Sequence, residues 1–216
     1  MNDAEKQRIL ATYSERLRQF GYSPETIGWP KRRHRLRYSI LVSHWPLPGA
    51  EVLDFGCGFG DLYAYCREQG IDVDYEGIDI NPDLVAEGRR QHPAAKLSVG
   101  DPLRDGLSRD YDYAFASGVH NFKLADNWSF VEATFELFHR HCRRGFAVNF
   151  LSDKVEYRRE DAFHTNPGRV LELAYRFSNR ITLRNDYMPF EFTLFVDKDQ
   201  RFDPAVAVFD DFRGYL

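Results

Sequence analysis

The stretch VLDFGCGFGDL, residues 52–62, decides how this chain folds, because it begins with the apolar pattern of a buried strand and ends like the start of a helix. Its glycines, Gly56, Gly58 and Gly60, let backbone N–H groups at the helix N-terminus approach a ligand closely. Their G-x-G-x-G spacing is not the G-x-G-x-x-G of dinucleotide-binding folds, and Asp54 would repel a pyrophosphate. The turn therefore predicts a ligand that carries a positive charge together with a carboxylate.

Two further acidic residues follow the next predicted strands. The next strand ends in GIDIN, and its Asp79 lies about twenty residues past the glycines, where a carboxylate can accept two hydrogen bonds from a ribose. Asp101, in VGDPLRD, follows the third strand and could accept a hydrogen bond from an adenine amine. A ligand with an amine, a sulfonium, a carboxylate and an adenosine fits all of these positions, and S-adenosylmethionine (SAM) has these groups.

Short apolar strands and helices alternate from residue 50 onward. We expect strands at residues 51–55, 73–79, 96–99, 111–117, 144–152, 180–187 and 190–196, with helices at residues 81–91, 127–142 and 168–177, the last capped by Asn166. This alternation predicts βαβ units and a parallel sheet. Because only Met188 and Pro189 separate the last two strands, these strands must pair antiparallel. The expected fold class is α/β, with a mostly parallel sheet, helices on both faces and an antiparallel hairpin at the C-terminal end.

The N-terminal region is expected to form a helical cap over residues 1–48, followed by a ligand-binding domain at residues 49–216. Apolar residues recur at helical spacing from Ile9 to Phe20, and Gly21 ends that helix. Pro30 would occupy the first position of a second helix that carries the basic run at residues 31–37.

Four motifs, VLDFGCGFGDL, GIDIN, GDPLRD and YDYAFASG, resemble the successive cofactor motifs of class I SAM-dependent methyltransferases. The resemblance covers roughly residues 50 to 150 and implies a Rossmann-like sheet of seven strands. It also implies that Asp54, Gly56 and Gly58 line the methionine end of SAM, that Asp79 holds the ribose and that Asp101 reaches the adenine. The full set of expected cofactor-binding residues is Asp54, Gly56, Cys57, Gly58, Asp79, Ile80, Asp101, Pro102, Ser117 and Gly118.

A looser similarity links the chain to a subgroup of small bacterial methyltransferases. It consists of TIGW at residues 26–29, the pair Arg37 and Tyr38 in the basic helix, and the pattern DY-x-x-FEFT at residues 186–193. This similarity supports the class and leaves the methyl acceptor open.

Methyl transfer from a sulfonium is an in-line displacement, so the main task of the protein is to hold the acceptor behind the methyl group and exclude water. His120 follows the fourth strand, at the edge where the methyl group should point, and is the candidate general base. Asn121 could orient the same acceptor. A packing role for His120 is the alternative.

Four residues are candidates for acceptor binding: Trp29, Arg37, His164 and Tyr187. The segment SGVH after the fourth strand lacks the Asn/Asp-Pro-Pro-aromatic motif of methyltransferases that modify nucleobase or glutamine nitrogens, which disfavours those substrates. No cluster has the spacing of a metal site, so no metal is expected.

The whole chain carries a net charge of −4, which offers no general attraction to nucleic acid or an anionic membrane. Three cysteines without paired spacing and the lack of a long apolar run favour a soluble cytoplasmic protein. The leading hypothesis is methyl transfer to an oxygen or nitrogen of a small polar molecule. One alternative is an RNA methyltransferase that uses the basic helix at residues 31–37, and another is a SAM-binding module without turnover.

Overall fold

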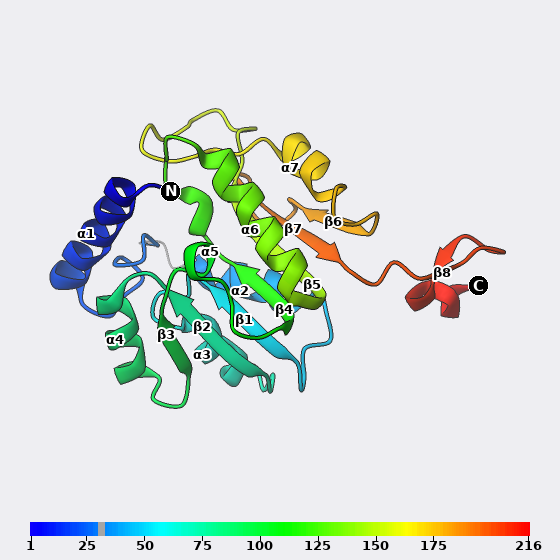
Figure 1. Cartoon of the computed structure of the whole chain (residues 1–216), viewed down its shortest axis with the longest axis horizontal. Coiled ribbons are helices and arrows are strands. Elements are labelled where there is room, and N and C mark those ends of the chain that lie inside the picture. The colour runs from blue at the N-terminus through cyan, green and yellow to red at the C-terminus, as the bar shows by residue number, and fades with distance from the viewer. Residues whose placement is uncertain (30–32) are drawn as a thin grey trace.

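The computed structural model describes residues 1–29 and 33–216, and its centre is a sheet of seven strands (Figure 1). The strands are β1 (Glu51–Phe55), β2 (Asp74–Asp79), β3 (Lys96–Val99), β4 (Tyr111–Ala116), β5 (Cys142–Leu151), β6 (Ile181–Arg184) and β7 (Glu191–Asp197). Their order is β3-β2-β1-β4-β5-β7-β6, and β7 runs antiparallel to both of its neighbours. The expected α/β fold with a mostly parallel sheet and a C-terminal antiparallel hairpin is confirmed. Residues 185–190 join the hairpin strands, a longer link than the two residues predicted.

Two apolar layers fix the helices on the faces of the sheet. The helices are α1 (Asp3–Phe20), α2 (His34–Val42), α3 (Asp61–Glu68), α4 (Pro82–Gln91), α5 (Pro102–Asp105), α6 (Asn127–His141) and α7 (Pro167–Ala174), with the 3₁₀ turns η1 (Val119–Asn121) and η2 (Asp210–Tyr215). Buried side chains of α6 and α7 pack on one face, and those of α2, α3 and α4 pack on the other. Because successive side chains of a strand point to opposite faces, Leu53 and Phe55 of β1 join the first layer and Val52 joins the second.

Local sequence signals account for where the helices begin. Asn81 caps α4 by accepting hydrogen bonds from the N–H groups of Asp83 and Leu84, at 2.9 and 3.1 Å. Asn166 caps α7 in the same way through the N–H of Arg169, as predicted. The helix predicted to begin at Pro30 begins at His34 in the described part of the chain, and Pro30, Lys31 and Arg32 lie outside the described residues.

Helix α1 lies apart from the two layers and crosses the carboxyl ends of the strands (Figure 1). The Ser14 hydroxyl donates a hydrogen bond to Asp83 of α4 at 2.5 Å, and Arg8 donates one to the carbonyl of Lys123 at 2.6 Å. Helix α2, by contrast, belongs to the core, since its Leu41 is fully buried against the sheet. The two helices of the expected N-terminal cap therefore have different positions in the fold.

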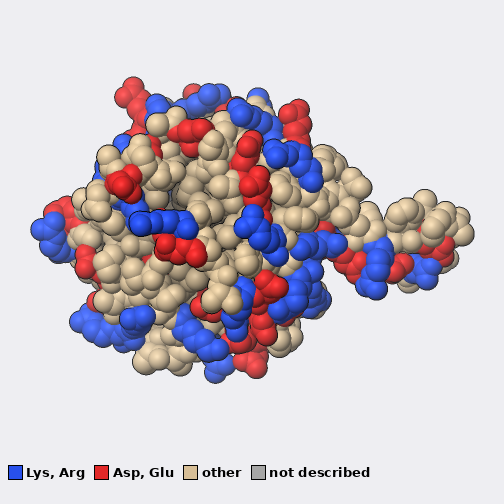
Figure 2. Space-filling view, in the orientation of Figure 1, with Lys and Arg blue, Asp and Glu red and all other residues tan. Residues whose placement is uncertain are grey.

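Residues 200–216 project from the body as an arm made of the short strands β8 (Phe202–Asp203) and β9 (Val208–Phe209) followed by η2 (Figures 1 and 2). Arg180 ties the arm to the body through an ion pair with Asp211 at 2.7 Å. No helix within residues 1–29 and 33–216 is long and apolar enough to cross a membrane.

Candidate active site

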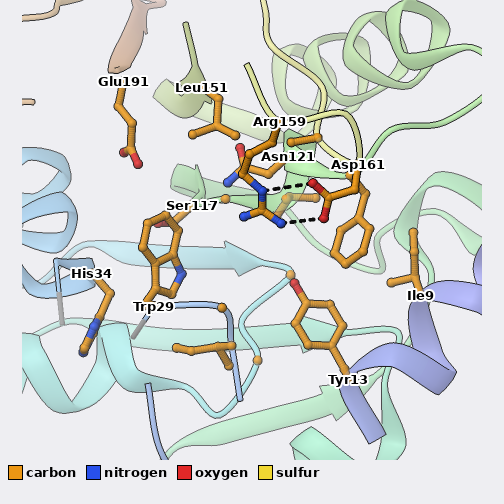
Figure 3. Close-up of a pocket in the computed structure, with 18 of the residues that line it drawn as sticks. Ile9, Tyr13, Trp29, His34, Ser117, Asn121, Leu151, Arg159, Asp161 and Glu191 are labelled. Atoms are coloured by element: carbon orange, nitrogen blue, oxygen red, sulfur yellow. Dashed lines mark hydrogen bonds and ion pairs between the residues drawn. The ribbon is translucent and has the colours of Figure 1, made fainter. Parts of the chain in front are cut away.

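A cavity of about 1370 Å³ lies at the carboxyl ends of the parallel strands, beneath α1. This is the edge at which doubly wound sheets bind their ligands. Eight of the ten residues expected to bind the cofactor line it: Gly56, Cys57, Gly58, Asp79, Ile80, Pro102, Ser117 and Gly118. Among the other candidates, Trp29, Asn121 and His164 also line the cavity (Figure 3 shows Trp29, Ser117 and Asn121).

The glycine turn has the backbone conformation that its sequence requires. Gly56, Gly58 and Gly60 have φ angles of +72°, +56° and +80°, a region that favours glycine. A β-carbon on Gly56 would also lie 2.5 Å from Cγ2 of Val119. Burial raises the pKa of the Cys57 thiol well above its usual value, so the thiol stays protonated and Cys57 can contribute through its backbone.

Asp79 is anchored at the end of β2 with room for further hydrogen bonds. Its carboxylate accepts hydrogen bonds from the backbone N–H groups of Gly58 and Asn81, both at 2.8 Å. Burial raises the pKa of Asp79, and these backbone hydrogen bonds oppose that rise. Each carboxylate oxygen can accept a second hydrogen bond, so the residue fits the two hydroxyl groups of a ribose.

Asp54, which the sequence placed at the mouth of the turn, does not line the cavity. It is buried on the face of β1 that packs against α2 and α3, and the Tyr75 hydroxyl donates a hydrogen bond to it at 2.7 Å. Burial raises the pKa of Asp54 to about 7, and the hydrogen bond from Tyr75 limits the rise. The structure therefore gives no direct contact between Asp54 and a ligand in the cavity.

Asp101 also lies off the cavity wall. Its carboxylate pairs with the Lys6 ammonium of α1 at 2.8 Å, and both side chains are mostly buried. The two residues are 95 positions apart in the sequence, so no pattern of neighbouring residues predicts this ion pair. The expected contact between Asp101 and adenine competes with this ion pair.

The loop at residues 152–165, together with Trp29 and Glu191, walls the far end of the cavity (Figure 3). The backbone N–H of Phe163 donates a hydrogen bond to the carbonyl of Asn121 at 2.9 Å, and that of Thr165 donates to Leu151 at 2.7 Å. These bonds hold the loop against η1 and β5, so it closes one side of the space beyond Ser117 and Gly118.

Both ring nitrogens of His164 are engaged within this loop. Nε2 accepts a hydrogen bond from the N–H of Arg159 at 3.1 Å, so Nδ1 can donate to the Ser152 carbonyl at 3.0 Å. The imidazole therefore braces the loop from the cavity wall.

A buried polar network lies at the start of β7. Arg37 donates from Nε and Nη2 to the two carboxylate oxygens of Glu191, both at 2.6 Å, and Asn149 donates to Glu191 at 3.1 Å. Tyr187 accepts a hydrogen bond from Asn149 at 3.0 Å. Arg37 and Tyr187, expected to bind the acceptor, are part of this network and do not line the cavity, whereas Glu191 does.

Glu191 and Asn149 were missed from the sequence. Asn149 lies in the mostly apolar segment RGFAVNFLS, and Glu191 lies in the mostly apolar segment FEFTLFV. A single polar residue among apolar neighbours was the signal that could have identified each of them. Buried polar side chains of this kind are kept when they have partners.

His120 does not reach the cavity. It is 2% exposed and lies between the rings of Phe130 and Phe150, with centroid distances of 4.9 and 5.3 Å. Neither ring nitrogen has a hydrogen-bond partner among the described residues, and burial lowers the pKa of His120 to about 3. This geometry gives no support to its role as a general base and matches the packing alternative.

No group of three or more His, Cys, Asp or Glu side chains in residues 1–29 and 33–216 is arranged to hold a metal ion.

Comparison with known proteins agrees with this arrangement. The model of the methyltransferase domain family matches residues 53–145. A Mycobacterium tuberculosis protein named as a methyltransferase, Rv1506c, is 33% identical over 155 residues, which make up 68% of this chain and 92% of that protein.

Solved structures extend the agreement to the fold. The magnesium protoporphyrin IX methyltransferase of Synechocystis PCC 6803 with bound S-adenosylhomocysteine (SAH) has a TM-score of 0.67 at 15% identity, covering 90% of this chain and 98% of that one. A TehB-like SAM-dependent methyltransferase from Corynebacterium glutamicum is 24% identical, with a TM-score of 0.57 and the same coverage. With its glycine turn and acidic strand end on the wall of one cavity, the chain belongs to the class I SAM-dependent methyltransferases, and SAM is its methyl donor.

Proposed function

We propose that this methyltransferase transfers the methyl group to an oxygen or nitrogen atom of a small polar molecule. The observation that carries the proposal is the size and enclosure of the cavity. Its volume of about 1370 Å³ exceeds the ~300–1000 Å³ of common ligand pockets, which leaves space beside the cofactor for a second molecule. Helix α1, Trp29 and the loop at residues 152–165 wall that space, an arrangement better suited to a small molecule than to a polymer.

The residues divide between two ends of the cavity. Gly56, Gly58 and Asp79 fit the methionine part and the ribose of SAM, through backbone N–H groups and a carboxylate. Bound SAM supplies a methyl group on a positively charged sulfur. Ser117 and Asn121 then hold the acceptor at the edge of β4, and the surrounding walls exclude water.

Two features of the structure disfavour the RNA alternative. Of the basic run at residues 31–37, Arg37 is paired with Glu191 in the core and is not free to bind phosphate, and Arg35 is paired with Glu68 on the surface at 2.6 Å. Lys31 and Arg32 lie outside the described residues. Acidic and basic side chains are also interspersed over the face shown in Figure 2.

We place the protein in the cytoplasm because its three cysteines are buried free thiols.

The first test of the proposal measures whether the protein binds the cofactor. SAH at about 100 times its dissociation constant should stabilise the protein by about 2.7 kcal/mol and raise its melting temperature, while NAD should not. Asp79→Ala should weaken SAH binding by about tenfold or more, because it removes a carboxylate acceptor. Asp72→Ala, which alters an exposed acid before β2 that does not line the cavity, is the matched control and should bind SAH like the wild type.

The second test of the proposal measures which compounds the protein methylates. SAH release should depend on small molecules in a panel of hydroxyl and amine compounds, measured by mass spectrometry of the products. RNA that binds at about 50 mM salt and is methylated would replace the proposal with the RNA alternative. Tight SAM binding without methylation of any small molecule or RNA would identify a module without turnover.

A further inference from the structure

One side of helix α1 faces the cavity. Ile9, Tyr13, Arg16 and Phe20 recur at helical spacing, and all four line the cavity wall. Figure 3 shows Tyr13 reaching from α1 into the cavity. Ile9 is the one buried residue of this helix, whereas α6 and α7 are fixed by whole rows of buried side chains. Apolar packing therefore contributes little to holding α1 in place.

Three carboxylates hold α1 and the turn after it against the body. The pairs, given as donor and acceptor, are Lys6 and Asp101 at 2.8 Å, Ser14 and Asp83 at 2.5 Å, and Tyr22 and Asp61 at 2.8 Å. The three acids stand at the beginnings of α5, α4 and α3, the helices that follow β3, β2 and β1. The contacts therefore run along the edge of the sheet that carries the glycine turn and Asp79, the part of the cavity that we propose for the cofactor.

The opposite side of α1 is also held by polar groups. Arg8 donates a hydrogen bond to the carbonyl of Lys123 at 2.6 Å, and Glu5 accepts one from the N–H of Ala125 at 2.6 Å. Water can replace the partners in exposed contacts of this kind, so each adds only modest net stability. Helix α1 can therefore separate from the body without exposing the apolar core.

We propose that residues 3–22 form a lid that must leave this edge of the sheet before the cofactor can enter or leave. The three carboxylate contacts set the fraction of time for which the lid is open. A bound cofactor adds contacts to the cavity-facing side of α1 and so favours the closed lid. The inference concerns cofactor exchange and does not depend on the identity of the methyl acceptor.

A lid of this kind has a distinctive effect on binding kinetics. Because opening precedes both entry and exit, weakening a contact of the closed lid raises the association and the dissociation rate constants together. The dissociation constant, which is their ratio, then changes little. A side chain that only contacts the bound ligand affects dissociation alone.

Single hydroxyl deletions test the inference with SAH as the probe. Ser14→Ala removes the contact with Asp83, and Tyr22→Phe removes the hydroxyl next to Asp61 while keeping the ring beside Phe59. Each variant should raise both rate constants about threefold, as expected for an exposed hydrogen bond to a charged group, and the double variant should raise both about tenfold. Stopped-flow tryptophan fluorescence measures both rates, since Trp29 lies on the cavity wall.

Arg18→Gln is the matched control for these variants. Arg18 pairs with Glu15 of the same helix, and both side chains are exposed, so the variant loses an ion pair of α1 and no contact with the body. Its rate constants should equal those of the wild type. A melting temperature like that of the wild type verifies that each variant is folded. Unchanged rates in the double variant, or a rise in dissociation alone, would overturn the inference.

A reversible cross-link tests the closed lid directly. Ser14→Cys with Asp83→Cys places two thiols where the wild-type side chains are in contact, while the native cysteines are buried. Oxidation with diamide should lower both SAH rate constants about tenfold or more, because the lid can no longer open, and dithiothreitol should restore them. Equally fast exchange before and after reduction of a disulfide verified by mass spectrometry would show that the cofactor does not pass beneath α1.

Discussion

Asp54 and His120 are ionisable groups that sit in the core a few residues from the cavity. In the part of the chain that the structure describes, Asp54 accepts a hydrogen bond from Tyr75, and His120 has aromatic rings on two sides. Burial favours the neutral form of each, which raises the pKa of the acid and lowers that of the base. The two residues therefore affect the pH dependence of stability in opposite directions.

Asp54→Asn should be more stable than the wild type in alkaline solution. The folded pKa of about 7 lies above the ordinary value of 3.8, so the stability that Asp54 contributes is complete below the ordinary value and is lost as pH rises through about 7. Asparagine keeps an oxygen for Tyr75 and cannot ionise. Urea unfolding should show the variant more stable by up to about 4 kcal/mol at about pH 8, with a much smaller gap at about pH 4. A gap that does not change with pH would contradict the buried, protonated carboxyl.

His120→Phe should keep turnover within about threefold of the wild type, because a general base contributes about 10²- to 10⁴-fold and this imidazole does not reach the cavity. The folded pKa of about 3 lies below the ordinary 6.5, so the wild type loses stability as pH falls from about 6.5 toward 3. The variant should lose less over that range in thermal melts. A hundredfold drop in turnover with SAH binding intact would restore His120 as the base.

At the scale of elements, the site is assembled from four parts that are distant in the sequence. The glycine turn after β1 and Asp79 at the end of β2 form the side that we propose for the cofactor, while η1 and the start of β7 form the side that we propose for the acceptor. Helix α1 covers both from above and is held mainly by polar contacts, with Ile9 as its one buried residue. Few buried apolar contacts are typical of a segment that opens more readily than the core.

Helix α1 should respond to the cofactor more strongly than the helices of the apolar layers. SAH should slow amide hydrogen exchange in α1 by about tenfold, because the helix lines the cavity that the ligand fills. Helix α7 has no residue on the cavity wall and serves as the internal control. Equal protection of α1 and α7 would mean that α1 does not close over the cofactor.

At the scale of the whole molecule, strand order determines where the chemistry occurs. The strand order changes direction between β1 and β4, which lie side by side in the sheet. The glycine turn follows the carboxyl end of β1, and Ser117 and Gly118 follow that of β4. An open parallel sheet binds ligands at such a switch point. The cavity therefore follows from the topology, and the N-terminal helix and the loop at residues 152–165 give it depth.

The sequence by itself determined the parts that depend on local order. The glycine turn, Asp79 at a strand end and the Asn166 cap each depend on a few neighbouring residues, so a pattern along the chain predicted them. Strand and helix periodicity gave the fold class for the same reason, and the family motifs gave the cofactor.

Only the tertiary structure decided which side chains line the space that we propose for the acceptor. Arg37 meets Glu191 across 154 positions and Lys6 meets Asp101 across 95, and no pattern along the chain records such pairs. Burial likewise removed His120 from the cavity, because the packing of η1 against α6 and β5 sets its direction. Local geometry thus identified the methyl donor, while the acceptor end depends on long-range packing that forms only when the whole chain folds.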